Sequence, residues 1–249
     1  MMVADWEVKR NSAIKILKAI EPPNGYYLAF SGGKDSCVIK ALANMAKVKY
    51  DAHYAVSGID PPELVRFIRD VHPDVKREVN YPPMFSSLPV AGFPIRHRRW
   101  CCNKYKECGG KGRIVVMGVR REESNNRAER EMLSWFNGKL CFNPIINWNE
   151  GDVWEFITHH EIPYCSLYDE GFDRLGCIGC PFVSVDTRKR EFERWPGFER
   201  AYRIAFRKLY ANRVQSNPKA VEPWPNGDAM FEWWVSNKPL SDAMQEKMF

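Results

Sequence analysis

The chain contains the segment Tyr26-Tyr27-Leu28-Ala29-Phe30-Ser31-Gly32-Gly33-Lys34-Asp35-Ser36, in which an apolar run leads into a glycine-rich loop. Residues 26–30 predict a short strand, and the apolar spacing after the loop predicts a helix over 36–47. At such a junction, glycines let backbone N–H groups approach an anion, and the helix N-terminus directs its dipole at the same point. Lys34 adds a positive charge, and Ser31 and Ser36 add hydroxyl donors. We therefore predict a compact pyrophosphate site, with an ordinary glycine turn as the alternative.

Strands and helices are expected to alternate through the rest of the chain. The sequence predicts helices over 5–20, from Pro61, over 152–160 and over 187–211 with a break at Pro196-Gly197, and strands over 50–56, 75–79 and 114–119. In the helix that begins near Pro61, the residues expected to face inward are Leu64, Phe67, Ile68 and Val71. Residues 80–112 are expected to form an extended loop region. This alternation predicts an α/β fold, an open and mostly parallel sheet with helices on both faces.

The composition indicates one main domain. The chain has 249 residues, of which 45% are hydrophobic, enough for one sizeable core. We predict a domain over residues 1–211 and a Trp-rich C-terminal extension over 212–249 that packs on the core. No apolar run reaches the roughly 18–20 residues of a membrane span, and the first residues lack the apolar stretch of a signal peptide. The expected location is therefore cytoplasmic, with no membrane partner.

Four of the eight cysteines stand in two pairs, Cys101-Cys102 and Cys177-Ile178-Gly179-Cys180. In a reducing cytosol such pairs are ligands more often than disulfides, and they suit zinc or an iron–sulfur cluster. One zinc ion requires sulfurs about 3.8 Å apart, whereas adjacent cysteines in an extended segment point to opposite faces. The separate iron corners of a [4Fe-4S] cluster are easier for such a pair to reach. The sequence therefore favours the cluster, and zinc or unliganded structural cysteines are the alternatives.

The other four cysteines carry weaker signals. Cys141 and Cys165 lie in apolar stretches and are expected in the core. Cys37 begins the helix after the glycine-rich loop, where the helix dipole can lower a thiol pKa, although core packing is favoured there too. Cys108 stands in basic and flexible surroundings. It is the candidate reactive thiol.

Basic residues cluster near both cysteine pairs, within a net charge of +6. The cluster Arg96–Arg99 precedes the first pair and is expected to bind phosphate or sulfate, since a guanidinium group donates two parallel hydrogen bonds to such oxygens. A second group follows the second pair: Arg188, Lys189, Arg190, Arg194, Arg200, Arg203, Arg207 and Lys208. This second group is either an anion-binding surface or a solvated helix face.

Several motifs, in order along residues 25–200, resemble the phosphoadenylylsulfate (PAPS) reductase family of PP-loop ATP pyrophosphatases. Ser31–Ser36 resembles the PP-loop, and Asp60–Glu63 resembles the segment that closes the nucleotide pocket. Gly118–Arg127 is similar to the family pattern Gly-x-Arg-x-x-Glu-Ser-x-x-Arg, and Asn143–Trp154 is similar to Pro-Leu/Ile-x-x-Trp…Asp-Val-Trp. Leu167–Phe172 then leads to the second cysteine pair, as it does in the family.

The resemblance implies an adenine nucleotide alpha hydrolase-like fold that binds the nucleotide at the carboxyl ends of the parallel strands. It implies catalytic roles for Lys34 and Asp35 with Mg²⁺. The implied nucleotide-binding residues are Ser31, Gly32, Gly33, Lys34, Asp35, Ser36, Arg120, Glu123 and Arg127. In the cluster-bearing adenylylsulfate (APS) reductases, a similar cysteine pattern binds a [4Fe-4S] cluster. The implied ligands are therefore Cys101, Cys102, Cys177 and Cys180.

Two departures from the reductases shape the expected function. Reductases of this family attack sulfur with a C-terminal cysteine, whereas this sequence has no cysteine after Cys180, and Glu107-Cys108-Gly109 only echoes that motif. Reductases also often carry a degenerate PP-loop, whereas this loop is intact. We therefore predict an ATP pyrophosphatase that adenylates a substrate for sulfur transfer, with the cluster carrying or positioning the sulfur. DNA phosphorothioation and tRNA thiolation enzymes are the nearest functional parallels.

The predicted partners are an adenine nucleotide, a sulfur donor such as a cysteine desulfurase or thioredoxin-like protein, and a candidate nucleic-acid substrate. The first alternative is an APS or PAPS reductase that uses Cys108 or a partner thiol and releases sulfite. The second is a non-catalytic iron–sulfur module that binds nucleotide. The intact Lys34 argues against mere binding, which does not need a pyrophosphate cradle.

Overall fold

The computed structural model describes residues 5–237, and these form two compact units. Within the described part of the chain, unit 1 comprises residues 5–56, 62–79 and 107–175. Unit 2 comprises residues 57–61, 80–106 and 176–237. The predicted boundary between residues 211 and 212 falls within unit 2 and stays a prediction, and residues 238–249 of the predicted extension lie outside the described residues.

In the described residues, unit 1 contains one six-stranded sheet with the strand order β3-β2-β1-β4-β6-β5. The strands are β1 Tyr26–Ala29, β2 Tyr50–Val56, β3 Lys76–Val79, β4 Ile114–Val116, β5 Leu133–Phe136 and β6 Lys139–Phe142. Neighbouring strands are parallel except β5 and β6, which form an antiparallel hairpin. The hairpin turns at Asn137 and Gly138, both with positive φ, as a two-residue hairpin loop requires.

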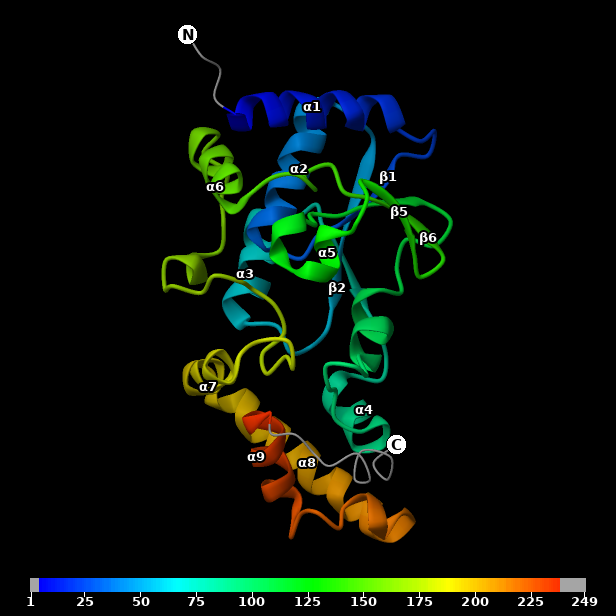
Figure 1. Cartoon of the computed structure of the whole chain (residues 1–249), viewed down its shortest axis with the longest axis vertical. Helices are drawn as coiled ribbons and strands as arrows, with labels where there is room; N and C mark the ends of the chain where they lie inside the picture. The colour runs from blue at the N-terminus through cyan, green and yellow to red at the C-terminus, as the bar shows by residue number, and fades with distance from the viewer. Residues whose placement is uncertain (1–4, 238–249) are drawn as a thin grey trace. The chain divides into compact units, whose positions relative to one another are not determined.

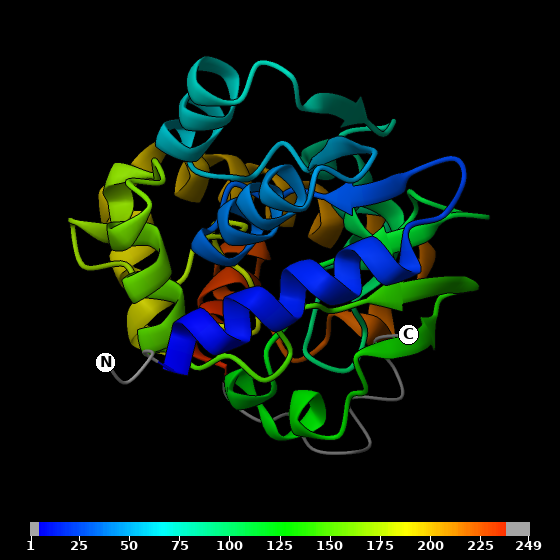
Figure 2. The same cartoon turned by 90° about the horizontal axis from the view of Figure 1, so that it is seen from above.

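The helices of unit 1 are α1 Asp5–Ile20, α2 Lys34–Ala46, α3 Pro62–Val71, α5 Asn125–Ala128 and α6 Glu150–His159, with 3₁₀ turns η2 Arg121–Glu123 and η3 Ser166–Tyr168. Helices α1, α2 and α6 pack against one another (Figures 1 and 2). Lys9 of α1 pairs with Asp152 of α6 at 2.7 Å. The core of unit 1 includes Leu17 of α1, Leu28 of β1 and Val38 of α2, which are all fully buried. The helices therefore hold the start of α2, where the glycine-rich loop ends, on a rigid base.

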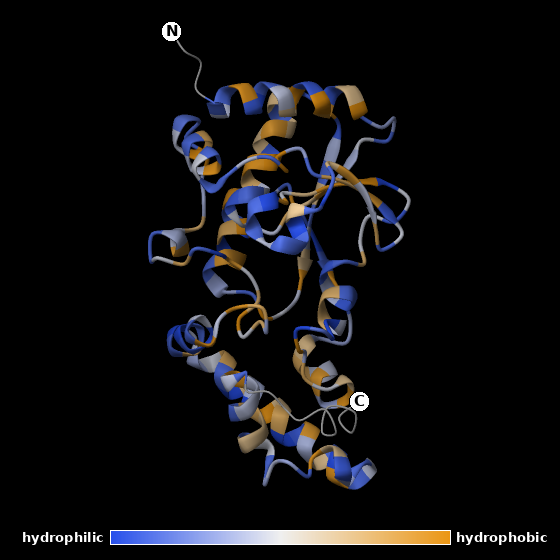
Figure 3. Ribbon diagram, in the orientation of Figure 1, coloured by the Kyte–Doolittle hydropathy of each residue, from blue (hydrophilic) through white to orange (hydrophobic). Residues whose placement is uncertain are grey.

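Unit 2 is helical in the residues described. Its elements are α4 Met84–Ala91, a π-helical turn η1 Cys102–Lys106, α7 Val185–Arg194, α8 Pro196–Ser216, a 3₁₀ turn η4 Pro218–Ala220 and α9 Gly227–Ser236. Its core is rich in aromatic rings: the centre of the Phe206 ring lies 5.3 Å from that of Trp234 and 5.5 Å from that of Phe231. Trp224 and Trp234 are buried and Trp233 is half-buried; that the Trp-rich extension packs on the core of the main domain stays a prediction. In Figure 3, α7 is coloured hydrophilic over most of its length.

The predicted fold class is confirmed, since the sheet is open and mostly parallel, with packed helices and a helical C-terminal region. The break at Pro196 is also confirmed: α7 ends at Arg194, and α8 begins at Pro196, where proline suits the first helical turn. Within residues 5–237, none of the helices combines the length and apolar character that crossing a membrane requires.

Several expected elements differ from the structure. Residues 80–112 are not one loop, because they contain α4 and the π-helical turn. The strand expected over 114–119 ends at Val116, since Gly118 and the residues after it turn toward α2. Val71 was expected to face inward but is 42% exposed, because α3 is only partly covered. Cys37 is buried, as the favoured prediction of core packing has it; burial raises the pKa of its thiol to about 12, so the alternative of a lowered pKa is wrong.

A polar cluster of buried Lys40 and His72 with exposed Asp74 ties α2 to the segment after α3, and it predicts a pH dependence of stability. Lys40 Nζ lies 3.1 Å from Nδ1 of His72 and 2.6 Å from Oδ1 of Asp74. Burial, and then the Lys40 charge, lower the pKa of His72 to about 4. Between pH 6.5 and 4 the unfolded chain therefore binds more protons at this residue, and stability falls as the pH falls.

His72→Phe is expected to remove from the unfolding free energy a pH-dependent component on the order of 3 kcal/mol between pH 7 and 4. Urea unfolding at both pH values measures it. The matched control is His97→Phe, because His97 is exposed. If both variants keep the wild-type pH dependence of stability, the inference that folded His72 stays neutral down to about pH 4 is wrong.

Candidate functional site

The glycine-rich loop lies at the carboxyl end of β1, where the strand order reverses. From β1 the chain passes outward to β2 and β3 and then returns to β4 on the other side of β1. Open α/β sheets bind ligands at such a reversal. The segments after β1 and β4 meet closely: a Cβ on Gly118 would lie 2.9 Å from the backbone of Asp35. Glycine at position 118 is therefore what lets the two segments approach.

The loop presents several donors around the first turn of α2. The helix N-cap is Gly33, which makes no side-chain cap. The Oγ atoms of Ser31 and Ser36 lie 3.3 Å apart, and the Ser36 hydroxyl donates to the Gly33 carbonyl at 2.8 Å. The backbone N–H of Lys34 donates to the Tyr168 hydroxyl at 2.9 Å. Hydroxyls and N–H groups at a helix N-terminus make a site suited to an anion.

The Lys34 side chain is almost fully buried, at 5% exposure. Its Nζ donates to the Asp173 carbonyl at 2.8 Å and pairs with Glu150 Oε1 at 3.1 Å. The ammonium also lies 5.2 Å from the ring centre of Tyr168 and 6.0 Å from that of Trp154. Burial acts to raise the pKa of Glu150, but the hydrogen bond and charge of Lys34 bring it below its ordinary value. Lys34 is thus a fixed cation beside the loop.

Asp35 begins a series of ionic contacts that continues into the segment after β4. Its Oδ1 accepts from Nε of Arg120 at 2.6 Å. The backbone N–H of Arg120 donates to Oε2 of Glu123 at 2.9 Å, and Glu123 also pairs with Arg127. Burial raises the pKa of Asp35, while Arg120 acts in the opposite direction. The structure therefore brings together the predicted residues of both segments; their roles stay predictions.

Gly32 is expected to be the least replaceable residue of the loop. Its φ is +77°, and a Cβ would lie 2.7 Å from Leu64 Cδ1 and 2.8 Å from Ile68 Cδ1, both buried side chains. Gly112 has a similar φ of +74°, but a Cβ there would meet nothing within 4 Å. Gly112→Ala therefore isolates the backbone cost of about 1–2 kcal/mol.

Gly32→Ala is expected to cost about 1–3 kcal/mol more than Gly112→Ala, because it also overpacks the core. Urea unfolding of the two variants measures the difference. Equal losses would show that the contacts with Leu64 and Ile68 do not constrain the loop.

The four cysteines proposed as ligands all belong to unit 2. Cys101 ends a short helical segment and Cys102 begins the π-helical turn, so the pair is helical and not extended as expected. The second pair forms a turn, in which the Cys180 N–H donates to the Cys177 carbonyl at 3.3 Å. A hydrogen bond from Cys101 to Cys102, then burial, then the charges of Cys102, Cys177 and Cys180 raise the pKa of the Cys101 thiol. The fold therefore brings both pairs into one neighbourhood.

Cationic and polar groups surround Cys177. Burial raises the pKa of its thiol to about 12, although a hydrogen bond from Lys106 and its charge oppose this. Lys106 Nζ pairs with Asp60 Oδ1 at 3.2 Å, and the Cys177 thiol lies 3.7 Å from the Ser57 hydroxyl. A thiolate at Cys177 would therefore need a nearby cation such as Lys106 to offset the cost of burying its negative charge.

The fit to a metal group is good in donor chemistry, because four thiols gather in one unit beside Lys106. As the side chains lie, however, no group of three or more His, Cys, Asp or Glu residues within residues 5–237 is arranged to hold a metal ion. The prediction of a metal centre therefore rests on the donors and stays a proposal.

Cys108 belongs to unit 1, although it follows the first cysteine pair by only a few residues in the sequence. The adjacent Gly109 packs against Tyr27, where a Cβ would lie 2.2 Å from the hydroxyl oxygen. Burial, Glu78 and the charge of Cys108 raise the pKa of Tyr27. A catalytic role for Cys108 stays a prediction.

The second basic group is largely engaged within unit 2. Arg188 is fully buried. Arg203 pairs with Glu199 at 2.7 Å and Glu232 at 2.5 Å, and Arg207 pairs with Asp228 at 2.9 Å. These three cations were candidates for an anion-binding surface, but their main contacts are structural. In the first group, Arg96, Arg98 and Arg99 are exposed, although Arg96 Nε donates to the Pro181 carbonyl at 3.1 Å and the Arg99 guanidinium lies 5.2 Å from the centre of the Phe182 ring.

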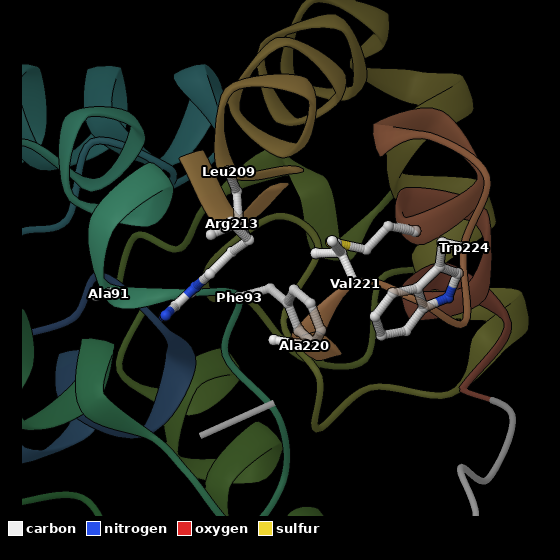
Figure 4. Close-up of a pocket in the computed structure, with 9 residues that line it drawn as sticks. Ala91, Phe93, Leu209, Arg213, Ala220, Val221 and Trp224 are labelled. Carbon is white, nitrogen blue, oxygen red and sulfur yellow. The ribbon is translucent and has the colours of Figure 1, made fainter. Parts of the chain in front are cut away.

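A separate pocket of unit 2 lies between α4, α8 and the Trp224 segment (Figure 4). Its lining is mostly apolar and includes Phe93, Leu209, Val221 and Trp224, with Arg213 as the charged residue. This lining offers no nucleophile or metal ligand, so we assign it no part in the chemistry.

Sequence reasoning missed three residues that contact Lys34, namely Glu150, Tyr168 and Asp173. Glu150 begins α6 and Tyr168 ends η3, so both lie more than 100 residues from the loop in sequence. The only signal was the motifs that the resemblance had already marked: Glu150 lies within Asn143–Trp154, Tyr168 lies within Leu167–Phe172, and Asp173 follows the second motif.

The chain matches known proteins over most of its length. The family model of the phosphoadenosine phosphosulfate reductase domain matches residues 25–183. An uncharacterized protein of Methanocaldococcus jannaschii is 30% identical over 201 residues, which is 70% of this chain and 41% of that protein. The chain thus spans about two fifths of the length of this curated relative.

Two further similarities agree with this match. An adenosine 5′-phosphosulfate reductase of Staphylococcus haemolyticus is 33% identical over 177 residues, which is 65% of this chain and 70% of that protein. Among solved structures, the PAPS reductase of Candida auris superposes with a TM-score of 0.51 at 17% identity, covering 71% of this chain and 97% of the other. At that identity the superposition supports the fold alone.

Proposed function

Because the chain belongs to the phosphoadenosine phosphosulfate reductase domain family, we propose that it is a PP-loop ATP pyrophosphatase that adenylates an acceptor in preparation for sulfur transfer. The observation that carries the proposal is the buried ammonium of Lys34 beside an intact loop at the N-terminus of α2. A cation fixed in this way can stabilise the charge that develops on a leaving pyrophosphate, and nucleotide binding alone would not require it.

The proposed reaction is a displacement at the α-phosphorus of ATP. An acceptor oxygen attacks this phosphorus, the bond to the bridging oxygen breaks, and pyrophosphate leaves with the electron pair. Lys34 and the first turn of α2 would hold the β- and γ-phosphates and stabilise their growing charge. Mg²⁺ that arrives with ATP would neutralise further charge, with Asp35 as the candidate carboxylate. A sulfur nucleophile would then displace AMP from the activated acceptor.

The cysteine centre is the second part of the proposal. Its four thiols, Cys101, Cys102, Cys177 and Cys180, are the donors that a [4Fe-4S] cluster takes. When bound, such a cluster would supply a place to hold sulfur or an electron during transfer. The sulfur donor would be a desulfurase or thioredoxin-like protein. A nucleic acid is the candidate acceptor, supported by the exposed cations of Arg96–Arg99.

A second candidate, an APS or PAPS reductase, is favoured by the named relative from Staphylococcus haemolyticus. That reaction needs a thiolate to attack the sulfur atom, break its bond to the bridging oxygen and release AMP from APS, or adenosine 3′,5′-bisphosphate from PAPS. The resulting S-sulfonated cysteine is then attacked by a second thiol, which releases sulfite and leaves a disulfide. Within this chain, Cys108 is the candidate attacking thiol. The candidate functions therefore differ in both the nucleotide and the residue they require.

One parallel experiment separates the two candidates. Anaerobically purified chain receives either ATP with Mg²⁺, sulfide and a total nucleic-acid extract, or APS and PAPS with reduced thioredoxin. We expect AMP and pyrophosphate from ATP and no sulfite. Sulfite release that Cys108→Ser abolishes, without any turnover of ATP, would overturn the proposal in favour of the reductase.

A further inference from the structure

The backbone of the loop Cys177–Cys180 is held by side chains from neighbouring helices. The hydroxyl of Tyr202 in α8 donates to the Ile178 carbonyl at 3.0 Å. From α7, Glu191 Oε2 accepts from the Gly179 N–H at 2.7 Å, and Arg188 Nη2 donates to the Cys180 carbonyl at 3.3 Å. Three successive residues of the loop are therefore fixed by polar contacts.

The turn itself leaves little room for adjustment. Gly179 has a φ of +73°, and a Cβ there would lie 3.0 Å from Phe192 and 3.1 Å from Tyr202. The Ile178 side chain is fully buried, and its N–H donates to the Ile59 carbonyl at 2.8 Å. The loop shape thus depends on the packing of α7 and α8.

Arg188 also donates hydrogen bonds to backbone carbonyls of α9. Its side chain is fully buried, with no measurable exposure. Nη1 donates to the Trp234 carbonyl at 2.6 Å and to the Val235 carbonyl at 3.2 Å, and the guanidinium lies 4.8 Å from the Trp234 ring. These carbonyls belong to the last turn of α9, the negative end of its dipole. One guanidinium therefore joins the end of α9 to Cys180.

A buried charge is costly unless it is well hydrogen-bonded, and three backbone carbonyls accept from this guanidinium. The fork of Arg188 satisfies carbonyls on two separate segments at once, which a point charge such as lysine cannot do equally well. Its cation also lies beside the cysteine pair, where thiolates would compensate it.

We propose that Arg188 is a positioning residue that makes α9 part of the cysteine centre, because it holds the backbone on the Cys180 side of the loop against the end of α9. The inference rests on the part of the proposed function that assigns Cys177 and Cys180 as ligands. Occupation of the centre and protection of α9 are then coupled: each favours the other.

The experiment compares wild type, Arg188→Lys, Arg188→Met and the control Lys189→Met, whose side chain is exposed on the same helix. Each chain is reconstituted anaerobically with ferrous iron and sulfide. Iron affinity is measured by competition with a chelator, and hydrogen exchange is followed for residues 227–236 with and without iron. Circular dichroism confirms the helical content of each variant.

We expect Arg188→Met to weaken iron binding about 10- to 100-fold, as loss of a supporting residue around a ligand does. Exchange in α9 should be faster by about tenfold or more, because charged hydrogen bonds to its last turn are lost. The iron affinity and the α9 exchange rate of Arg188→Lys should lie between those of Arg188→Met and wild type. Both quantities should be the same in Lys189→Met as in wild type. In wild type, iron should slow exchange in α9 while leaving α1 unchanged.

The wild-type measurement keeps the proposal testable even where a variant does not fold. Exchange in α9 that is identical with and without iron would overturn the coupling, and so would wild-type iron affinity in a folded Arg188→Met variant. A wild-type chain that binds no iron would overturn the ligand assignment. A chain that binds iron with this coupling but releases no pyrophosphate would overturn only the proposed reaction.

Discussion

Lys34→Met is expected to lower the kcat/KM for pyrophosphate release from ATP by about 10²–10³-fold, the effect of removing one donor that stabilises developing charge. Lys34 is a buried cation of the loop, and methionine keeps the apolar part of its side chain. Its partner Glu150 is 52% exposed, so its carboxylate stays solvated when the ammonium is lost. The fold should therefore survive the substitution.

Lys40→Met is the matched control, because Lys40 is a second buried lysine of α2 that pairs with Asp74. It is expected to lower the unfolding free energy and to leave kcat/KM within about threefold of wild type. The expected loss for Lys34→Met is much larger, about 10²–10³-fold. Steady-state release of pyrophosphate at saturating and limiting ATP measures both variants. Equal losses in the two would mean that Lys34 contributes only to stability, which contradicts the proposed role.

Cys177→Ser is expected to remove nearly all iron, from about four atoms per chain after anaerobic reconstitution to below one. The serine oxygen is a poor replacement for a thiolate at iron, and Cys177 interacts electrostatically with both Cys101 and Cys180. Iron and acid-labile sulfide per chain are the measured quantities.

Cys141→Ala is the control, because Cys141 is fully buried in β6 of unit 1 and should not affect iron. A wild-type chain that takes up one zinc ion, with no iron and no visible absorption, would favour the zinc alternative. If Cys177→Ser holds as much iron as Cys141→Ala, the ligand assignment is wrong.

The central elements of the fold could be predicted from the sequence because local signals agree there. The apolar runs of β1 and β2 and the proline at the start of α8 each indicate one structure only. Helix α4 was missed because Pro82, Pro83 and Pro89 suggest a loop, although the helix begins after the first two and accommodates the third. The hairpin of β5 and β6 was missed despite its Asn137-Gly138 turn, which is a strong local signal.

The candidate site was predictable only where its residues lie in one motif. The loop Ser31–Ser36 is contiguous, so glycine, lysine and helix signals combine. Glu150, Tyr168 and Asp173 reach Lys34 through tertiary packing, which no spacing in the sequence reveals. The same holds for Arg188, whose contacts with α9 depend on the packing of three helices.

The most direct test of the proposed function is product analysis of one anaerobic reaction. The reconstituted chain is incubated with ATP labelled in all three phosphates, Mg²⁺, sulfide and the nucleic-acid extract, and the labelled products are resolved. The proposal predicts AMP and pyrophosphate in equal amounts, both dependent on Lys34. ADP and orthophosphate as the products, or intact ATP beside sulfite from APS in the parallel reaction, would contradict it.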